Sequence, residues 1–256
     1  MTHETSTKRR KRIILFRQRV IVCIRLSRVL LRLLCRNQFH LSHCLPIEKK
    51  GIGQSSTFLL GKQVVIKVKN ELASNNNRKK YNGAFDGLFF YEDTVERLRK
   101  EYDLYAELSD CGITARPLLF TEYAIALEYL SGAVPLGECE TISDEMVTHI
   151  FQLINRLHDM GIFHGDLNLT NLLVMNGVIH VIDFESSRHV EPHKEEDLYC
   201  LDIIIFIRRL HQLYPKQFRA TFPAVHAQVE RLRALHPLLV EQGRRYLPAE
   251  VYNELF

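Results

Sequence analysis

The sequence predicts an α+β fold of two lobes, a small β-rich N-terminal lobe and a reduced helical C-terminal lobe, preceded by a basic helix. Strand-like runs of branched residues and one helix fill residues 48–130, helical patterns dominate residues 131–256, and residues 1–47 form a basic extension. The chain has 256 residues, of which 46% are hydrophobic and 25% are charged. This composition is ordinary for a soluble globular protein, and the length suffices for one two-lobed unit with a sizeable core.

The N-terminal extension carries most of the positive charge. Residues 1–47 contain eleven Lys or Arg and one acid, so they contribute +10, whereas the whole chain has a net charge of +4. Arg25, Arg28, Arg32 and Arg36 share one helical face because they are spaced by three and four residues. Such a helix suits an anionic membrane surface, and we expect residues 8–36 to bind one. The alternative is a helix that packs on the rest of the protein with a solvated basic face.

Other classes of partner and site are disfavoured. The longest apolar run of the extension, Val20 to Ile24, is far shorter than the roughly 20 residues of a membrane span. Aromatic residues are sparse in the extension, so we expect no nucleic-acid binding. Six scattered cysteines without a Cys-x-x-Cys pair or a secretory signal indicate reduced thiols in the cytoplasm. The residues that could be drawn as zinc ligands match no standard zinc framework; they are Cys35, His40, His43 and Cys44.

The N-terminal lobe begins with two strands joined by a turn that contains glycine and serine. Gly51, Gly53, Ser55 and Ser56 lie in or beside this turn, which is either a loop that covers a phosphate or an ordinary hairpin turn. The next strand, Gln63 to Lys69, places two lysines on the same face.

A polar tract and a helix follow. Residues 70–94 form either a mobile loop or a flap that faces a substrate. Helical spacing of apolar residues predicts a helix from Thr94 to Ser109, and a glycine follows its end. A second hairpin is expected from Pro117–Phe120 and Tyr123–Glu128.

The most informative stretch of the C-terminal lobe runs from His164 to Glu185. Branched residues predict strands at 172–174 and 178–182, and Asn176-Gly177 between them is a strong hairpin turn signal. A hairpin there would bring Asp166 and Asn171, which precede it, close to Asp183 at its exit. Hard divalent cations require such convergent oxygen groups. A helix with a capping signature at Ser143 precedes the stretch, and an apolar helix begins at Glu196.

These motifs resemble those of protein kinases. Asp166 followed five residues later by Asn171 is similar to the catalytic loop, Asp183-Phe184-Glu185 is similar to the Asp-Phe-Gly metal site, and Val64-Val65-Ile66-Lys67 matches the Val-Ala-Ile-Lys strand. The resemblance implies a phosphotransferase that uses ATP and Mg²⁺.

The resemblance also implies a role for each site residue. Asp166 would accept or orient the hydroxyl proton, and Asn171 and Asp183 would hold the metal. Lys67 would hold the nucleotide phosphates, with Lys69 as the competing assignment. Further cofactor-binding roles follow: the glycine-serine turn would cover the phosphates, Glu101 would pair with the lysine, and the backbone of Glu128 and Leu130 would receive the adenine.

The sequence departs from the protein-kinase pattern in three places. Gly165 replaces the Arg of His-Arg-Asp, and Glu185 replaces the last glycine of Asp-Phe-Gly, as in small-molecule kinases of the choline-kinase type. Only fourteen positions separate Asp183 from Asp197, and no Ala-Pro-Glu motif follows, so little chain remains to form a platform for a peptide. Asp197 is similar to the aspartate that supports the catalytic loop. His158 and His164 are expected to anchor this loop by hydrogen bonds rather than to bind metal.

The compact catalytic loop and the short segment after it look most like those of the bacterial lipopolysaccharide kinases, the Kdo and heptose kinase group. This resemblance implies phosphorylation of a lipid-linked sugar hydroxyl of the lipopolysaccharide inner core, at the cytoplasmic face of the inner membrane. Three alternatives stay open: a small-molecule kinase of the choline or aminoglycoside type, a compact atypical protein Ser/Thr kinase, and a pseudokinase scaffold. Intact Lys67, Asp166, Asn171 and Asp183 argue against the scaffold. The oligomeric state is left open.

Overall fold

The structure is a computed structural model that describes residues 20–33, 35, 48–50, 55–69, 94–191, 196–215, 218 and 222–256. It divides into two compact units: Met1–Ala106 with Ala115–Ser131, and Glu107–Thr114 with Gly132–Phe256. Several predicted features lie outside the described residues. These are Gly51 and Gly53, most of the 70–94 tract, the basic residues before position 20, and three of the four candidate zinc ligands.

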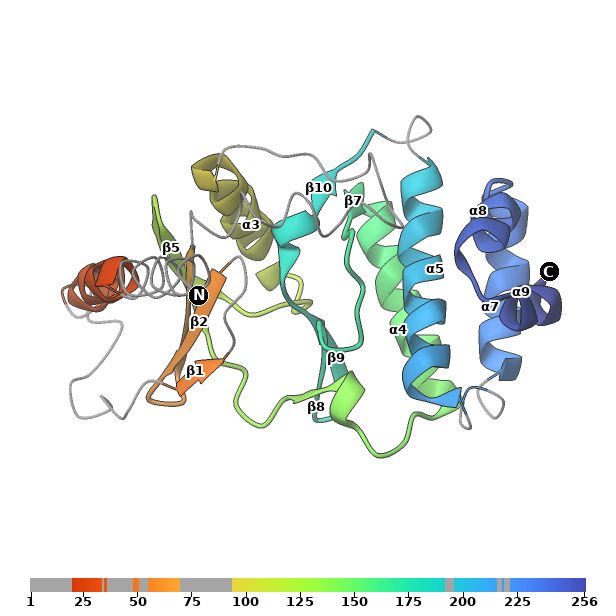
Figure 1. Cartoon of the computed structure of the whole chain (residues 1–256), viewed down its shortest axis with the longest axis horizontal. Coiled ribbons are helices and arrows are strands. Elements are labelled where there is room, and N and C mark those ends of the chain that lie inside the picture. Colours follow the sequence, from red (N-terminus) through yellow and green to blue (C-terminus); the bar gives the residue numbers. More distant parts are fainter. Residues whose placement is uncertain are drawn as a thin grey trace, which may run out of the picture. The chain divides into compact units, whose positions relative to one another are not determined.

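The first unit is built on one antiparallel sheet (Figure 1). Its strands are β1 (Glu48–Lys50), β2 (Ser55–Leu60), β3 (Val64–Lys69), β4 (Pro117–Thr121) and β5 (Ala124–Glu128), in the order β1-β2-β3-β5-β4. The helix α3 (Thr94–Ser109) has the predicted bounds, and the predicted β4–β5 hairpin is confirmed. These elements hold Lys67 and Glu101, the two site residues predicted for the middle of this lobe.

The N-terminal helix, residues 20–33, packs on this sheet. Its buried side chains are Val22, Leu26, Val29 and Leu33, which form one cluster with apolar residues of β2 to β5 such as Ile66 and Ala126. Burial of this face stabilises the helix, because each fully buried aliphatic side chain contributes roughly 1.5–3 kcal/mol. The helix is therefore a component of the first unit. Within the part of the chain that is described, no helix is both long and apolar enough to cross a membrane.

The second unit is mainly helical. Its helices are α4 (Asp144–Asp159), α5 (Glu196–Leu213), α7 (Phe222–Leu235), α8 (Leu239–Tyr246) and α9 (Ala249–Leu255). Figure 1 shows α4 and α5 running side by side. The hydroxyl of Ser143 accepts a hydrogen bond from the Met146 N–H, so the predicted cap of α4 is confirmed. The mixed helix and sheet composition agrees with the predicted α+β class.

Short strands carry the functional loops of the second unit. They are β6 (Val134–Pro135), β7 (Ile162–Phe163), β8 (Leu172–Met175), β9 (Val178–Val181) and β10 (Arg188–His189), and two short 3₁₀ helices accompany them, η2 (Leu136–Glu138) and η3 (Phe184–Ser186). The predicted hairpin is confirmed, since Met175 of β8 pairs with Val178 of β9 across Asn176-Gly177. Both turn residues have positive φ, 52° and 78°, as a type I′ turn requires.

Candidate active site

Lys67 and Glu101 form a buried ion pair in the first unit. The Nζ atom of Lys67 lies 2.7 Å from Oε1 of Glu101, and the Glu101 side chain is 0% exposed. The predicted pairing is thus confirmed, and it involves Lys67, the lysine at the motif position. Lys69 is also buried; its N–H donates to the Tyr123 carbonyl, and its own carbonyl accepts from Arg25. A buried charge needs a partner, so the Lys67–Glu101 ion pair fixes both of its side chains in one conformation.

The other cofactor-binding residues predicted in this unit differ in their surroundings. Ser55 and Ser56 begin β2, opposite Lys69 and Val68 of β3, and Ser56 is buried. The N–H of Glu128 donates to the Arg116 carbonyl, so it is already used within the unit. The Glu128 carboxylate lies 3.4 Å from the Arg116 guanidinium, and both side chains are largely exposed. Leu130 is half-buried, and its role in adenine binding stays a prediction.

In the second unit, Asp166 and Asn171 face each other across one loop. The Nδ2 atom of Asn171 donates to the Asp166 carbonyl at 3.0 Å and to its carboxylate Oδ2 at 3.3 Å. A second amide, from Asn168, lies 3.4 Å from the other carboxylate oxygen. Both amide groups therefore orient the Asp166 carboxylate. Because Asn171 uses its nitrogen here, its side-chain oxygen is the atom that can bind a cation.

Asp183 is brought to the same loop by the backbone. The N–H of Ile182 donates to the Asn171 carbonyl at 2.9 Å, which places Asp183 beside the residues that precede the hairpin. Asp183 itself has a left-handed backbone with φ of 67° and leads into η3. Left-handed backbone is uncommon for residues other than glycine, although aspartate adopts it more readily than most, and it concentrates at functional sites. The backbone thus brings Asp183 to the loop of Asp166 and Asn171, and its charge acts on the Asp166 carboxyl.

The pKa of the Asp166 carboxyl is raised above its ordinary value, mainly by burial. The negative charge of Asp183 raises the pKa further, whereas His164, Arg209 and the hydrogen bond from Asn171 lower it. A carboxylate with a raised pKa is a stronger base than an exposed one, provided that it remains ionised at the working pH. The arrangement therefore suits proton acceptance at Asp166.

His164 and Asp202 support this loop from within the unit. The carboxylate of Asp202 accepts the His164 N–H at 2.8 Å and the Gly165 N–H at 2.9 Å, and it lies 3.3 Å from the His158 ring. The His164 ring contacts the Ile182 carbonyl and the Asp166 N–H. The two histidines thus anchor the loop as predicted. The structure describes Asp202 as a supporting aspartate, whereas the side chain of Asp197, which was predicted for this role, lies outside the described residues.

A sequence signal for Asp202 existed. It is the one acid in the run Leu201–Ile207 of α5, and it is 0% exposed. A carboxylate inside an apolar helix must find hydrogen-bond donors elsewhere, because an unpaired buried charge is costly. In the structure these donors are the N–H groups of His164 and Gly165 in the catalytic loop.

A steric constraint explains why position 165 holds a glycine. Its φ is 80°, and a Cβ added there would lie 2.7 Å from the Ser186 carbonyl oxygen. No side chain fits at this position, so the arginine of the protein-kinase motif is excluded by the close approach of η3 to the loop.

Mg²⁺ in enzymes that act on nucleotides is usually held by one or two protein oxygens together with substrate phosphates. Asn171 and Asp183 supply two such oxygens beside Asp166, so the residues present fit this ion. Lys67 supplies a cation of the kind that holds nucleotide phosphates, and Glu101 keeps it in place.

Residues 61–222 match the family model of the RIO domain, which covers more than half of the chain. The chain belongs to the RIO domain family. A Rio2 kinase from Chaetomium thermophilum, solved as an ADP/Mg²⁺-phosphoaspartate complex, is similar in structure, with a TM-score of 0.52 and 16% identity over 80% of this chain and 75% of that one. The two-lobed kinase-like fold is thereby confirmed. The family match and the kinase-like fold agree with the predicted kinase, and the ADP and Mg²⁺ are those of the Rio2 structure.

Other relatives match shorter parts of this RIO domain protein. A probable bifunctional tRNA threonylcarbamoyladenosine biosynthesis protein of Methanospirillum hungatei is 34% identical over 112 residues, 42% of this chain and 21% of that protein. The lipopolysaccharide core heptose(II) kinase WaaY of Escherichia coli is 32% identical over 80 residues, 31% of this chain and 34% of WaaY. The chain thus spans about a fifth and a third of these two relatives.

Proposed function

We propose that this RIO domain protein is an atypical protein kinase that transfers the γ-phosphoryl group of ATP to a serine or threonine hydroxyl of a protein. The observation that carries the proposal is the RIO match over residues 61–222. This range contains the Lys67–Glu101 ion pair and the loop with Asp166, Asn171 and Asp183.

Each side chain has a task in this reaction. ATP would supply the phosphoryl group and leave as ADP, and bound Mg²⁺ would neutralise the charge on the phosphates. Asp166, oriented by Asn171, orients the acceptor hydroxyl and takes its proton, while the oxygens of Asn171 and Asp183 hold the metal. Lys67 holds the donor phosphates and is kept in position by Glu101. Phosphoryl transfer needs positioning and charge neutralisation more than covalent chemistry, and these residues provide both.

A second candidate acceptor is a sugar hydroxyl of the lipopolysaccharide core, as predicted from the sequence. The match to WaaY favours it, and so does the short segment between Asp183 and α5, which leaves little chain for binding a peptide. The catalytic residues would have the same tasks with either acceptor. A choline-type or aminoglycoside-type acceptor finds support only in Glu185 at the end of the metal motif.

A panel of acceptors tests the proposal. The protein is incubated with labelled ATP and Mg²⁺ together with a casein-like protein, extracted lipopolysaccharide or choline, and the label is followed into each acceptor. We expect transfer to protein. We also expect Asp166→Ala, checked for folding, to abolish transfer while nucleotide binding changes little. Label in lipopolysaccharide alone would select the second candidate, and full transfer by Asp166→Ala would refute the assigned base. Stabilisation against heat by ATP only when Mg²⁺ is present separates a catalyst from a scaffold.

A further inference from the structure

The N-terminal helix, residues 20–33, has one face that the sheet does not cover. Its inner face is buried in the first unit, as described above. The outer side chains include Val20, Ile21, Ile24 and Leu31, which are all exposed; Ile24 is 52% exposed and Leu31 is 63% exposed. Four exposed aliphatic side chains on one helix form an apolar stripe, which in soluble proteins marks a place of contact with another surface.

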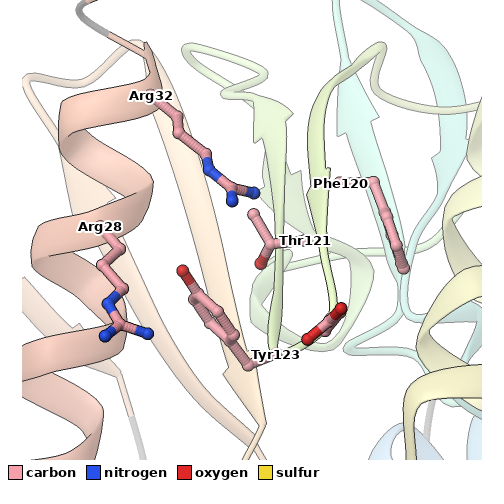
Figure 2. A pocket seen from close by; sticks show the side chains of 6 residues that line it. Arg28, Arg32, Phe120, Thr121 and Tyr123 are labelled. Atoms are coloured by element: carbon pink, nitrogen blue, oxygen red, sulfur yellow. The ribbon is translucent and has the colours of Figure 1, made fainter.

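A cavity of about 380 Å³ lies beside this stripe. It is lined by Arg28 and Arg32 of the helix and by Phe120, Thr121, Glu122 and Tyr123 of the β4–β5 hairpin. Figure 2 shows both arginines extending from the helix toward the hairpin, with the Tyr123 hydroxyl pointing into the space between them. The two arginines are exposed, and neither forms an ion pair with the residues that the structure describes.

The Tyr123 side chain is held in this position from two sides. The Thr121 hydroxyl donates to the Ala124 carbonyl and accepts the Ala124 N–H, both at 3.0 Å, which closes the turn around Tyr123. The guanidinium carbon of Arg25 lies 5.6 Å from the centroid of the Tyr123 ring, and the guanidinium donates to the Lys69 carbonyl. The Tyr123 hydroxyl is buried, yet among the described residues it has no hydrogen-bond partner. A buried hydroxyl without a partner is costly, so a phosphate oxygen that entered the cavity far enough to reach it would supply the missing acceptor.

The chemistry of this cavity selects an anion with several oxygen atoms. Two guanidinium groups form forked, charge-assisted hydrogen bonds with phosphate, and a tyrosine hydroxyl adds a third donor. Glu122 is the opposing charge at the rim, and because it is exposed it stays hydrated. A free phosphate ion has no apolar part that could contact the stripe, whereas a lipid presents a phosphate and an apolar region next to each other.

We propose that the cavity between Arg28, Arg32 and Tyr123 binds the headgroup phosphate of an anionic lipid, and that the stripe of Val20, Ile21, Ile24 and Leu31 enters the membrane interface beside it. The protein would then be a peripheral membrane protein. The net charge of +10 in residues 1–47 attracts it to an anionic surface. The inference does not depend on the phosphotransferase proposal, since no residue of the catalytic loop takes part.

Vesicle flotation with the full chain tests the proposal. The vesicles contain phosphatidylcholine alone or phosphatidylcholine mixed with phosphatidic acid, and inorganic phosphate serves as the soluble source of the same group. We expect binding to the anionic vesicles only. Each arginine near an anionic surface contributes roughly fivefold, so Arg28→Gln/Arg32→Gln should weaken binding by about 30-fold. The matched control is Arg231→Gln/Arg233→Gln on α7, which removes two exposed arginines elsewhere and should change binding little.

Three further variants separate specific from general attraction. Tyr123→Phe keeps the ring and removes the hydroxyl, so binding should fall by about tenfold if the hydroxyl donates to phosphate. Ile24→Gln/Leu31→Gln tests the stripe and should weaken binding without affecting the fold, because both side chains are exposed. Glu122→Gln should strengthen binding. Equal losses in the arginine variant and the α7 control would overturn the proposal, as would undiminished binding by Tyr123→Phe or binding of inorganic phosphate without any vesicle association.

Discussion

The Lys67–Glu101 ion pair gives a quantitative prediction, because its two ends can be changed singly or together. Glu101 is 0% exposed and the Lys67 side chain is 9% exposed. Removing one partner of a buried pair costs about 3–5 kcal/mol, since the other charge is left in the interior, whereas replacing both by apolar groups of similar size is often neutral. We therefore expect Lys67→Met or Glu101→Leu alone to lower the free energy of unfolding by about 3–5 kcal/mol, and the double variant to restore most of it.

In thermal unfolding, these costs correspond to a fall in Tm of roughly 6–20 °C for each single variant, at about 2–4 °C per kcal/mol. Phosphate transfer should follow a different pattern. All three variants lose the positioned lysine, so kcat/KM for ATP should stay low even where stability returns. For phosphate transfer, Lys69→Met serves as the control, since it removes the competing lysine and leaves the Lys67–Glu101 ion pair intact. A double variant as unstable as the single ones would refute the coupling, and full transfer by Lys67→Met would refute the phosphate-holding role.

Three other changes in the second unit have defined outcomes. Gly165→Ala should lower the free energy of unfolding, measured with urea, by about 1–3 kcal/mol more than Gly177→Ala does. Both glycines have φ near 80°, but only a Cβ at Gly165 would meet a carbonyl oxygen, at 2.7 Å. Equal losses in the two variants would contradict the steric reason. Arg209→Gln should raise the pKa of Asp166 further, because the charge of Arg209 lowers that pKa. The acidic limb of the pH profile of kcat/KM should then move to higher pH. An unmoved limb would mean that Asp166 is not the titrating base. Asp202→Asn removes the charged acceptor of two backbone N–H groups, so the free energy of unfolding should fall by about 1.5–3 kcal/mol. The variant should also lower kcat and leave KM for ATP unchanged. An unchanged kcat would show that Asp202 does not position the loop.

Local patterns predicted the elements that hold the site. The Asn176-Gly177 turn, the α3 helix and the Ser143 cap depend on residues close in sequence, and the structure contains each of them. The convergence of Asp166, Asn171 and Asp183 followed from the hairpin, because a two-residue turn fixes which residues meet at its open end. Together with the resemblance of these motifs to those of protein kinases, this convergence predicted a kinase before the fold was known.

The parts that could not be predicted depend on contacts between distant segments. Asp202 lies 38 positions after His164, and no local pattern states which amide groups a buried carboxylate will meet. Gly165 looked like a missing arginine until the position of Ser186 was known. The identity of the acceptor could not be predicted either, because the surfaces around the site select it. The family and the catalytic residues are compatible with a protein hydroxyl or a sugar hydroxyl.

The N-terminal helix shows how two predictions that looked exclusive can both hold. Packing on the protein and binding to a membrane were alternatives as long as the helix had only one apolar face. The structure divides its apolar residues into a buried set and an exposed set, with Arg28 and Arg32 on the flank between the hairpin and the exposed set. A helix held by its buried face presents these arginines at fixed positions, so lipid binding would not need to order the helix first. Selectivity for a phosphate over diffuse negative charge would then come from the packing of the helix on the sheet, and weakening that packing should reduce the discrimination between phosphatidic acid and other anionic lipids.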